Sequence, residues 1–235
     1  GEFAMSHLGV LAKRTLFSGV RLAYRRPPGT VVFTAGCPGS GKSYSIARLL
    51  GLDAGDWGGA KNVTILDLDR VMRSHELYEE YASAKRIPSL YEKKEVYYWC
   101  DKKIETEFTR LLNEADKGDC TNVEPLTIVV DGTGTNIKRQ RRRMTMAREA
   151  GFHVCLVNVA VSMDKIIERN KSRERVVPQE TLDNYFSRIP EAMRVIKSEG
   201  LVDEYIEVDN EGDVHEESKW QRDRALANKM LFFEE

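Results

Sequence analysis

The stretch TVVFTAGCPGSGKSYSIARLL, Thr30 to Leu50, decides the fold of this 235-residue chain. Residues 30–34 are β-branched or apolar and predict a buried strand. The next eight residues, GCPGSGKS at 36–43, match G-x-x-x-x-G-K-[ST] at every fixed position, and residues 45–50 predict a helix. A strand, a glycine-rich loop and a helix in this order predict a phosphate-binding loop (P-loop), whose backbone N–H groups surround the phosphates of a nucleoside triphosphate.

The P-loop assigns chemistry to individual residues. Lys42 is expected to reach the β- and γ-phosphates of ATP, and the Ser43 hydroxyl is expected to hold Mg²⁺. The residues expected to bind ATP are Gly36, Cys37, Pro38, Gly39, Ser40, Gly41, Lys42, Ser43, Tyr44 and, after the last strand, Asn210.

Composition narrows the class of protein. A formal net charge of -1 argues against a globally cationic nucleic-acid-binding protein, and no apolar run approaches the length needed to span a membrane. The four cysteines, at 37, 100, 120 and 155, lie far apart, and none stands at zinc-ligand spacing from a histidine. We expect free thiols in a reducing compartment, which favours the cytoplasm.

Strands and helices alternate along the chain. Further strands are predicted at 62–66, 126–130, 153–161 and 204–208, and helices at 90–115, 138–150, 163–171 and 179–198. Alternation of this kind predicts an α/β domain of the three-layer P-loop NTPase fold, with a five-stranded parallel sheet and helices on both faces. We assign residues 30–212 to this domain.

The two ends of the chain fall outside that domain. Residues 1–4, GEFA, resemble a cloning remnant ahead of Met5, and residues 5–29 form a basic extension without Asp or Glu. This extension is interpreted either as a helix packed on the domain, which we favour, or as a mitochondrial transit peptide. Residues 213–235 predict a C-terminal helix with Leu226, Met230 and Phe233 on one side.

Acidic residues end two of the predicted strands, where α/β proteins gather their chemistry. Asp67 and Asp69 follow the second strand, and strand alternation would point both side chains the same way. One of them could accept the proton of an attacking hydroxyl. Asp131 ends the third strand in a Walker-B-like pattern and could hold Mg²⁺. For each acid the alternative is a helix cap or a solvated strand end.

An arginine-rich segment follows the fourth strand. Arg169, Lys171, Arg173 and Arg175 precede Pro178. We predict an arginine-rich lid that closes over the γ-phosphoryl group and stabilises its developing charge, the alternative being a solvated helix face.

Five motifs in order, AGCPGSGKS, ILDLD, VVDGTGTN, IERN followed by RERVVP, and IEVDNEG, resemble the zeta toxins and the wider polynucleotide-kinase-like group of P-loop kinases. The resemblance covers roughly residues 30–212. Zeta toxins phosphorylate the nucleotide sugar UDP-N-acetylglucosamine, so the resemblance implies an ATP- and Mg²⁺-dependent kinase. By the same resemblance Asp69 is the catalytic base with Asp67 beside it on the substrate side, and Arg169 and Arg175 contact phosphate. The implied substrate contacts are Thr133 and a glutamate that is either Glu105 or Glu107.

The sequence departs from the family pattern after Asp131. Zeta toxins have an arginine where this chain has Thr135, and the following helix gains Lys138, Arg139, Arg141, Arg142, Arg143 and Arg148. A basic cluster can attract a polyanion, so Lys138, Arg139, Arg142 and Arg143 could bind nucleic acid, or they could form a solvated face.

Three functions therefore stay open. The first is a kinase acting on a small molecule or nucleotide sugar, the second a polynucleotide 5′-hydroxyl kinase, and the third a P-loop ATPase switch. No guanine-specific NKxD signature follows the fourth strand. An antitoxin-like protein partner is also left open by the resemblance.

Overall fold

The computed structural model describes residues 29–51, 62–117, 125–173 and 175–211. Within these ranges five parallel strands form one sheet in the order β2-β3-β1-β4-β5. The strands are β1 (Gly29–Ala35), β2 (Val63–Leu66), β3 (Leu126–Val130), β4 (His153–Ala160) and β5 (Glu204–Asp209). The five-stranded parallel α/β fold predicted from the sequence is confirmed.

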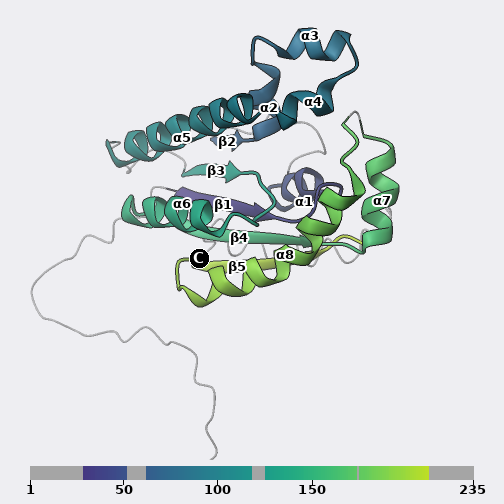
Figure 1. The fold of residues 1–235 in the computed structure, drawn as a ribbon. Coiled ribbons are helices and arrows are strands. Elements are labelled where there is room, and N and C mark those ends of the chain that lie inside the picture. Colours follow the sequence, from purple (N-terminus) through teal and green to yellow (C-terminus); the bar gives the residue numbers. More distant parts are fainter. Residues whose placement is uncertain (1–28, 52–61, 118–124, 174, 212–235) are drawn as a thin grey trace, which may run out of the picture.

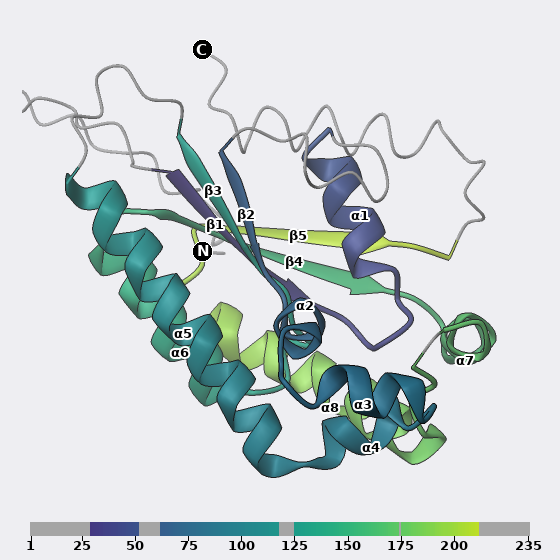
Figure 2. The same ribbon diagram turned by 90° about the horizontal axis from the view of Figure 1, so that it is seen from above.

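Helices cover both faces of this sheet. Helix α1 (Lys42–Leu49) lies on one face, and α5 (Lys94–Lys117), α6 (Ile137–Glu149) and α8 (Gln179–Ser198) lie on the other, as Figures 1 and 2 show. Side chains of β1 alternate between the two layers: Phe33 joins the core beneath α5, α6 and α8, whereas Val32 joins the core beneath α1. Burial on both faces explains why the central strand has an almost continuous apolar sequence.

Three short helices follow β2 and gather near the start of α5 (Figure 2). They are α2 (Leu68–Arg73), α3 (Tyr78–Ser83) and α4 (Ile87–Glu92), and they pack on a small core of their own that includes Met72, Leu90 and Cys100. The helix expected at 90–115 is two helices, because Lys93 adopts an extended conformation between α4 and α5.

The remaining helix, α7 (Met163–Lys171), lies beyond the end of β4 at the right of Figure 1. The predictions for residues 1–28 and 213–235 lie outside the described residues. Among the helices of the described part of the chain, none has the length and apolar character needed to cross a membrane.

Candidate functional site

The P-loop leaves the carboxyl end of β1, at the centre of the sheet. Gly39 and Gly41 have φ angles of 91° and 83°, a conformation that glycine adopts without strain. Left-handed Gly41 caps α1, so this helix begins at Lys42 rather than at the expected residue 45. The Asn210 side-chain amide donates to the Ser40 carbonyl over 2.7 Å, and a Cβ on Gly41 would lie 2.4 Å from the same amide. Asn210 thus holds the backbone of the P-loop from the end of β5.

The side chains of the P-loop and of the start of α1 differ in their hydrogen bonds and exposure. The Lys42 ammonium donates to the carbonyl oxygens of Gly36 and Cys37, at 3.1 and 3.3 Å, so it lies over the loop. Ser43 is exposed, and the Tyr44 hydroxyl accepts a hydrogen bond from Arg48 on the outer side of α1. Burial raises the pKa of the Cys37 thiol to about 11, which keeps it neutral and unreactive at pH 7.

The acids after β2 are arranged differently from the expectation. The strand ends at Leu66, and Asp67 is the N-cap of α2, accepting a hydrogen bond from the Asp69 backbone N–H over 2.9 Å. Asp69 therefore lies in the first turn of a helix, and the prediction that both side chains alternate on one strand face is wrong. A short polar N-cap ends the strand here because its carboxylate satisfies an otherwise unpaired helical N–H group.

Asp67 and Asp131 meet at neighbouring strand ends. Leu66 and Val130 are partners in the β2–β3 register, so the residues that follow them lie side by side. Burial, followed by the negative charge of Asp131, raises the pKa of Asp67 to about 6. Two carboxylates in this position favour a bound cation, and oxygen ligands are those that Mg²⁺ prefers.

Thr34 on β1 is a site residue that the sequence reasoning missed. Its buried hydroxyl lies 2.6 Å from an Asp131 carboxylate oxygen, to which it donates, and it accepts from the Gly132 N–H over 2.9 Å. Thr34 therefore fixes the orientation of Asp131. The available signal was a hydroxyl residue in an apolar strand immediately before a P-loop.

The arginine-rich segment connects the P-loop with Asp69. Arg169 on α7 donates to the Asn210 carbonyl over 3.0 Å, and its other terminal nitrogen lies beside Gly41. Farther along, the Arg175 guanidinium lies 3.8 Å from an Asp69 carboxylate oxygen and 3.8 Å from the centre of the Tyr91 ring. The two arginines predicted to contact phosphate thus flank the space between the nucleotide-binding loop and the predicted base.

Each arginine of this segment keeps an unused donor. In the described ranges Arg169 Nη1, Arg173 Nη1 and Arg175 Nε are buried and have no hydrogen-bond partner. A buried N–H without an acceptor is unfavourable, so the segment is suited to an anion that brings its own oxygen atoms. Asn170 closes the base of the segment, because its side chain exchanges two hydrogen bonds with the Val177 backbone, at 2.8 and 3.0 Å. Arg173 was predicted from the sequence as part of the lid without a separate role, and Asn170 was not identified.

The other predicted substrate contacts are engaged within the protein. The hydroxyls of Thr133 and Thr135 lie 3.0 Å apart, and Thr135 is only 8% exposed. Glu105 forms ion pairs with Arg142 and Arg143 at 2.8 and 2.9 Å. Glu107 pairs with Arg110 of its own helix, and this hydrogen bond lowers the pKa of the Glu107 carboxyl. A substrate role for these residues stays a prediction.

The basic cluster of α6 faces acids. Buried Arg143 binds both Asp101 and Glu105 of α5, and Arg139 lies 3.3 Å from Asp101. Arg141 pairs with Glu199, and Arg148 pairs with Asp203. These arginines connect α6 with α5 and with the end of α8.

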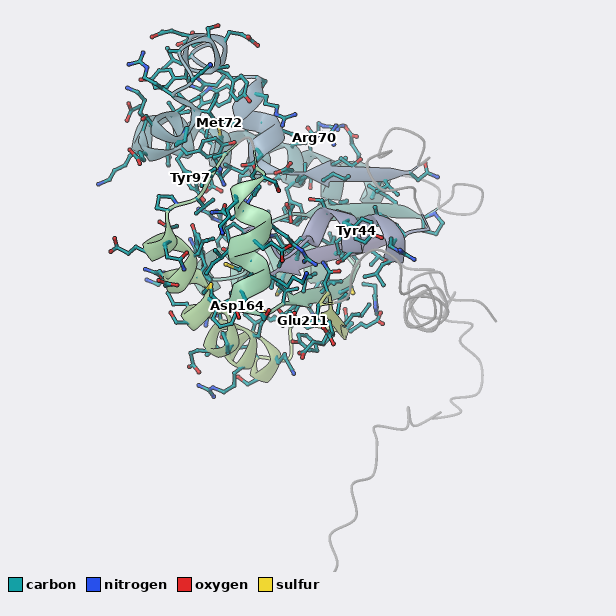
Figure 3. The ribbon with its side chains drawn as sticks, turned by 90° about the vertical axis from the view of Figure 1, so that its right-hand side faces the viewer. Tyr44, Arg70, Met72, Tyr97, Asp164 and Glu211 are labelled. Atoms are coloured by element: carbon teal, nitrogen blue, oxygen red, sulfur yellow. The ribbon has the colours of Figure 1, made fainter. Side chains whose placement is uncertain are left out.

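Figure 3 looks onto the carboxyl edge of the sheet, where Tyr44 of α1 and Tyr97 of α5 lie on opposite sides. A cavity of about 720 Å³ lies between α8 and strands β4 and β5, with Phe186, Ile189 and Met193 among its lining residues. It touches the P-loop at Gly36 and Cys37 from the α8 side.

The fold and the P-loop together define a protein of the P-loop nucleotide-binding class. Within that class the model of the family described as Zeta toxin matches residues 17–219, and this chain belongs to the zeta toxin family. The resemblance inferred from the ordered motifs is thereby confirmed.

One similar solved structure supports the fold. A structure from the PezAT chromosomal toxin–antitoxin system of Streptococcus pneumoniae is similar with 13% identity and a TM-score of 0.56, over 88% of this chain and 87% of that chain. Shikimate kinase from Acinetobacter baumannii, in complex with shikimate, has 18% identity over 88% of this chain and 93% of that chain, with a TM-score of 0.41. The search of curated proteins gives no match.

Proposed function

We propose that this protein is a kinase that transfers the γ-phosphoryl group of ATP, with Mg²⁺, to a hydroxyl group of a small molecule or nucleotide sugar. The observation that carries the proposal is the path of the arginine segment, since Arg169 reaches the P-loop and Arg175 reaches Asp69. A base and a phosphate-binding segment in contact are the parts that phosphoryl transfer to a hydroxyl requires. Membership of the zeta toxin family supports the same reaction type.

The residues present fit the implied nucleotide and metal. The glycines of the P-loop leave space where a Cβ would collide, and no cation of the described residues forms an ion pair with the adjacent Asp67 and Asp131. Ser43 and Asp131 would hold Mg²⁺, which would neutralise part of the charge on the β- and γ-phosphates. Lys42 would leave the loop carbonyls to which it now donates and bind phosphate oxygens instead.

The reaction proceeds by transfer of one proton and one phosphoryl group. Asp69 accepts the proton of the acceptor hydroxyl, whose oxygen forms a bond to the γ-phosphorus. The bond between that phosphorus and the β–γ bridging oxygen breaks, and ADP leaves. The unused donors of Arg169, Arg173 and Arg175 stabilise the charge that develops on the transferred group. By covering the phosphates, the segment would also exclude water as a competing nucleophile.

The alternatives find less support in the geometry. A polynucleotide acceptor would use the basic residues of α6, but four of these arginines bind acids of α5 and α8. An ATPase switch would hydrolyse ATP without an acceptor, whereas Asp69 and Arg175 form a site suited to a bound hydroxyl. Because the similar Streptococcus pneumoniae structure comes from a toxin–antitoxin system, we extend the proposal to an antitoxin-like protein partner.

The deciding experiment measures transfer of labelled phosphate from ATP to UDP-sugars, nucleosides and 5′-hydroxyl oligonucleotides. Asp69→Asn should retain ATP binding and lose about 100-fold or more in single-turnover transfer, because the amide cannot accept the proton. Lys42→Ala should lose both ATP binding and transfer. Asp164→Asn, which alters an exposed acid in the first turn of α7, is the matched control and should transfer normally.

Failure takes a definite form in this experiment. Full transfer by Asp69→Asn would show that Asp69 is not the base. A greater loss of transfer in Asp67→Asn than in Asp69→Asn would assign the base to Asp67. Rapid ATP hydrolysis that no acceptor changes would favour the switch.

A further inference from the structure

Tyr91 lies at the junction of the proposed base and the arginine segment. It belongs to α4, one of the short helices that follow β2, and no motif in the sequence marks it. The Arg175 guanidinium carbon lies 3.8 Å from the centre of its ring, within the distance of a close cation–π contact. The Asp69 carboxylate, 3.8 Å from the same guanidinium, is near enough for its negative charge to act on the Tyr91 hydroxyl.

The surroundings of Tyr91 also shift the pKa of its hydroxyl. Burial, followed by the negative charge of Asp69, raises the pKa of Tyr91 above its usual range, while the positive charge of Arg175 acts in the opposite direction. Tyr91 therefore keeps its proton at pH 7 and can donate it in a hydrogen bond to Asp69. A neutral hydroxyl beside a carboxylate orients the carboxylate without competing for the substrate's proton.

We infer that Tyr91 is a positioning residue for phosphoryl transfer: its ring holds Arg175 and its hydroxyl orients Asp69. The inference rests on the proposed function for its kinetic part. Arg175 and Asp69 stand 106 positions apart in the chain, and their direct contact of 3.8 Å is too long for a good hydrogen bond. An aromatic ring that contacts one and a hydroxyl that reaches the other bring the two groups together without a tight ion pair, which would have to break when the acceptor arrives.

The lid hypothesis gains a specific docking contact from this arrangement. Asn170 closes the base of the arginine segment, whereas Tyr91 holds its far end through Arg175. Stacking requires a planar cation and an aromatic face, so phenylalanine can replace the ring function but not the hydroxyl function. The two functions are therefore separable by substitution.

Tyr81 provides a matched control. Like Tyr91, it packs against the small core of Met72, Leu90 and Cys100, and it also lies under cations, with Arg86 at 5.2 Å and Lys93 at 5.8 Å. Its cation contacts are with residues next to α4 rather than with Arg175. Tyr81→Leu therefore removes a similar aromatic side chain from the same core without touching Arg175.

The experiment compares Tyr91→Phe, Tyr91→Leu and Tyr81→Leu in the full chain, with two readouts. Limited trypsin digestion reports docking of Arg175, since cleavage after this residue precedes exposed Val176. Single-turnover transfer and the dissociation constant of ATP report catalysis. We expect Tyr91→Leu to be cleaved after Arg175 several-fold faster than Tyr81→Leu, and Tyr91→Phe to be cleaved at the wild-type rate.

The kinetic expectation follows the same separation. Tyr91→Phe should lower transfer about 10-fold, and Tyr91→Leu about 100-fold, with ATP affinity unchanged in both, because neither function concerns nucleotide binding. Equal cleavage of Tyr91→Leu and Tyr81→Leu would overturn the ring function, and full transfer by Tyr91→Phe would overturn the hydroxyl function. Should Tyr91→Leu not fold, Tyr91→Phe alone decides the hydroxyl function, and Tyr91→His, read by the same digestion, decides the ring. If the wild type transfers phosphate to no acceptor, the proposed function fails while the digestion still tests the docking contact.

Discussion

Two arginine-rich segments of this protein have similar sequences and opposite environments. In α6 the arginines at 139, 141, 142, 143 and 148 each pair with a carboxylate of another helix or of the loop before β5. In the last turn of α7 and just after it, the arginines at 169, 173 and 175 each retain a buried donor that no described residue accepts from. The first set is compensated by acids and holds helices together. In the described part of the second set, compensation is limited to the 3.8 Å contact of Arg175 with Asp69, so this set is suited to bind an anion. Arginine content by itself does not distinguish a structural cluster from a binding segment.

The strongest test of this comparison is Arg175→Ala. Removal of the guanidinium should lower turnover about 1,000-fold with little change in ATP affinity, because its contact with the transferred group is strongest in the transition state. Arg175→Lys should remain poor, since an ammonium lacks the planar fork that stacks on Tyr91. The measurement is single-turnover transfer together with ATP binding.

Arg141→Ala is the control from the other segment. Arg141 pairs with Glu199 on the surface, and its loss should leave transfer at the wild-type level. If Arg175→Ala instead lowers ATP affinity as much as it lowers turnover, Arg175 contacts the nucleotide already in the ground state.

The second test concerns α6, where we expect loss of an arginine to lower the stability of the protein rather than its turnover. Arg143 is 5% exposed and binds Asp101 and Glu105, so Arg143→Ala leaves two partly buried carboxylates short of a partner. We expect the free energy of unfolding to fall by about 3 kcal/mol. Arg141→Ala, which removes a surface pair, should lower it much less.

Urea unfolding monitored by circular dichroism measures both values. If Arg143→Ala and Arg141→Ala lose equal amounts of unfolding free energy, burial does not make the Arg143 ion pairs more stabilising than the surface pair of Arg141. Catalysis by the folded fraction of Arg143→Ala should be retained.

The comparison also explains how far the sequence could be read. The strand–loop–helix order around the P-loop and the apolar strands depend on local periodicity, so the sheet and the loop were predictable. Asp69, Arg169 and Arg175 were predicted as site residues because motifs mark them. Pairing of Arg143 with Asp101 and Glu105 depends on how α5 packs beside α6, which no local pattern encodes.

Errors in the sequence reading arose where side chains overrode periodicity. Asp67 caps α2 and places Asp69 in a helical turn, where strand alternation had been expected, and extended Lys93 separates α4 from α5. Tyr91 and Thr34 contact residues distant in sequence. No local pattern marks Tyr91, and for Thr34 the only signal was a hydroxyl residue in the apolar strand before the P-loop.

Carboxylates show the same contrast between paired and unpaired charges, and here we expect a smaller effect on stability. Asp101 and Glu105 are compensated by arginines, whereas Asp67 lies beside Asp131 and has its pKa raised from 3.8 to about 6, first by burial. The folded state thus binds the Asp67 proton more tightly than the unfolded state does. The contribution of Asp67 to the stability of the wild type should therefore fall as the pH rises from about 4 to about 6 and then level off.

Asp67→Asn removes this dependence and keeps the helix cap, because asparagine caps helices as well as aspartate does. At pH 7.5 the variant should be more stable than the wild type by about 1–2 kcal/mol, a value discounted from the full shift for partial exposure. The difference should vanish near pH 4. Unfolding by urea at pH 4, 5, 6 and 7.5 measures it, and a constant difference across that range would contradict the effect of the Asp67–Asp131 pair.

The smallest effect is expected where α6 faces solvent. Lys138 is exposed, and Arg142 is 56% exposed although it pairs with Glu105, so these two are the cations that a polynucleotide could reach most easily. If the acceptor is a small molecule or nucleotide sugar, Lys138→Gln combined with Arg142→Gln should change transfer by less than about 2-fold, because neither group contacts Asp69, Arg175 or the P-loop. If the acceptor is a polynucleotide, binding of a 5′-hydroxyl oligonucleotide should weaken, and the slope of log K against log salt should flatten by about 1 to 2 as two phosphate contacts are lost. Titration of the oligonucleotide at several salt concentrations distinguishes the two outcomes. A flattened slope would turn the α6 cluster from a structural connection into a binding surface and would remove the contrast between the two arginine segments.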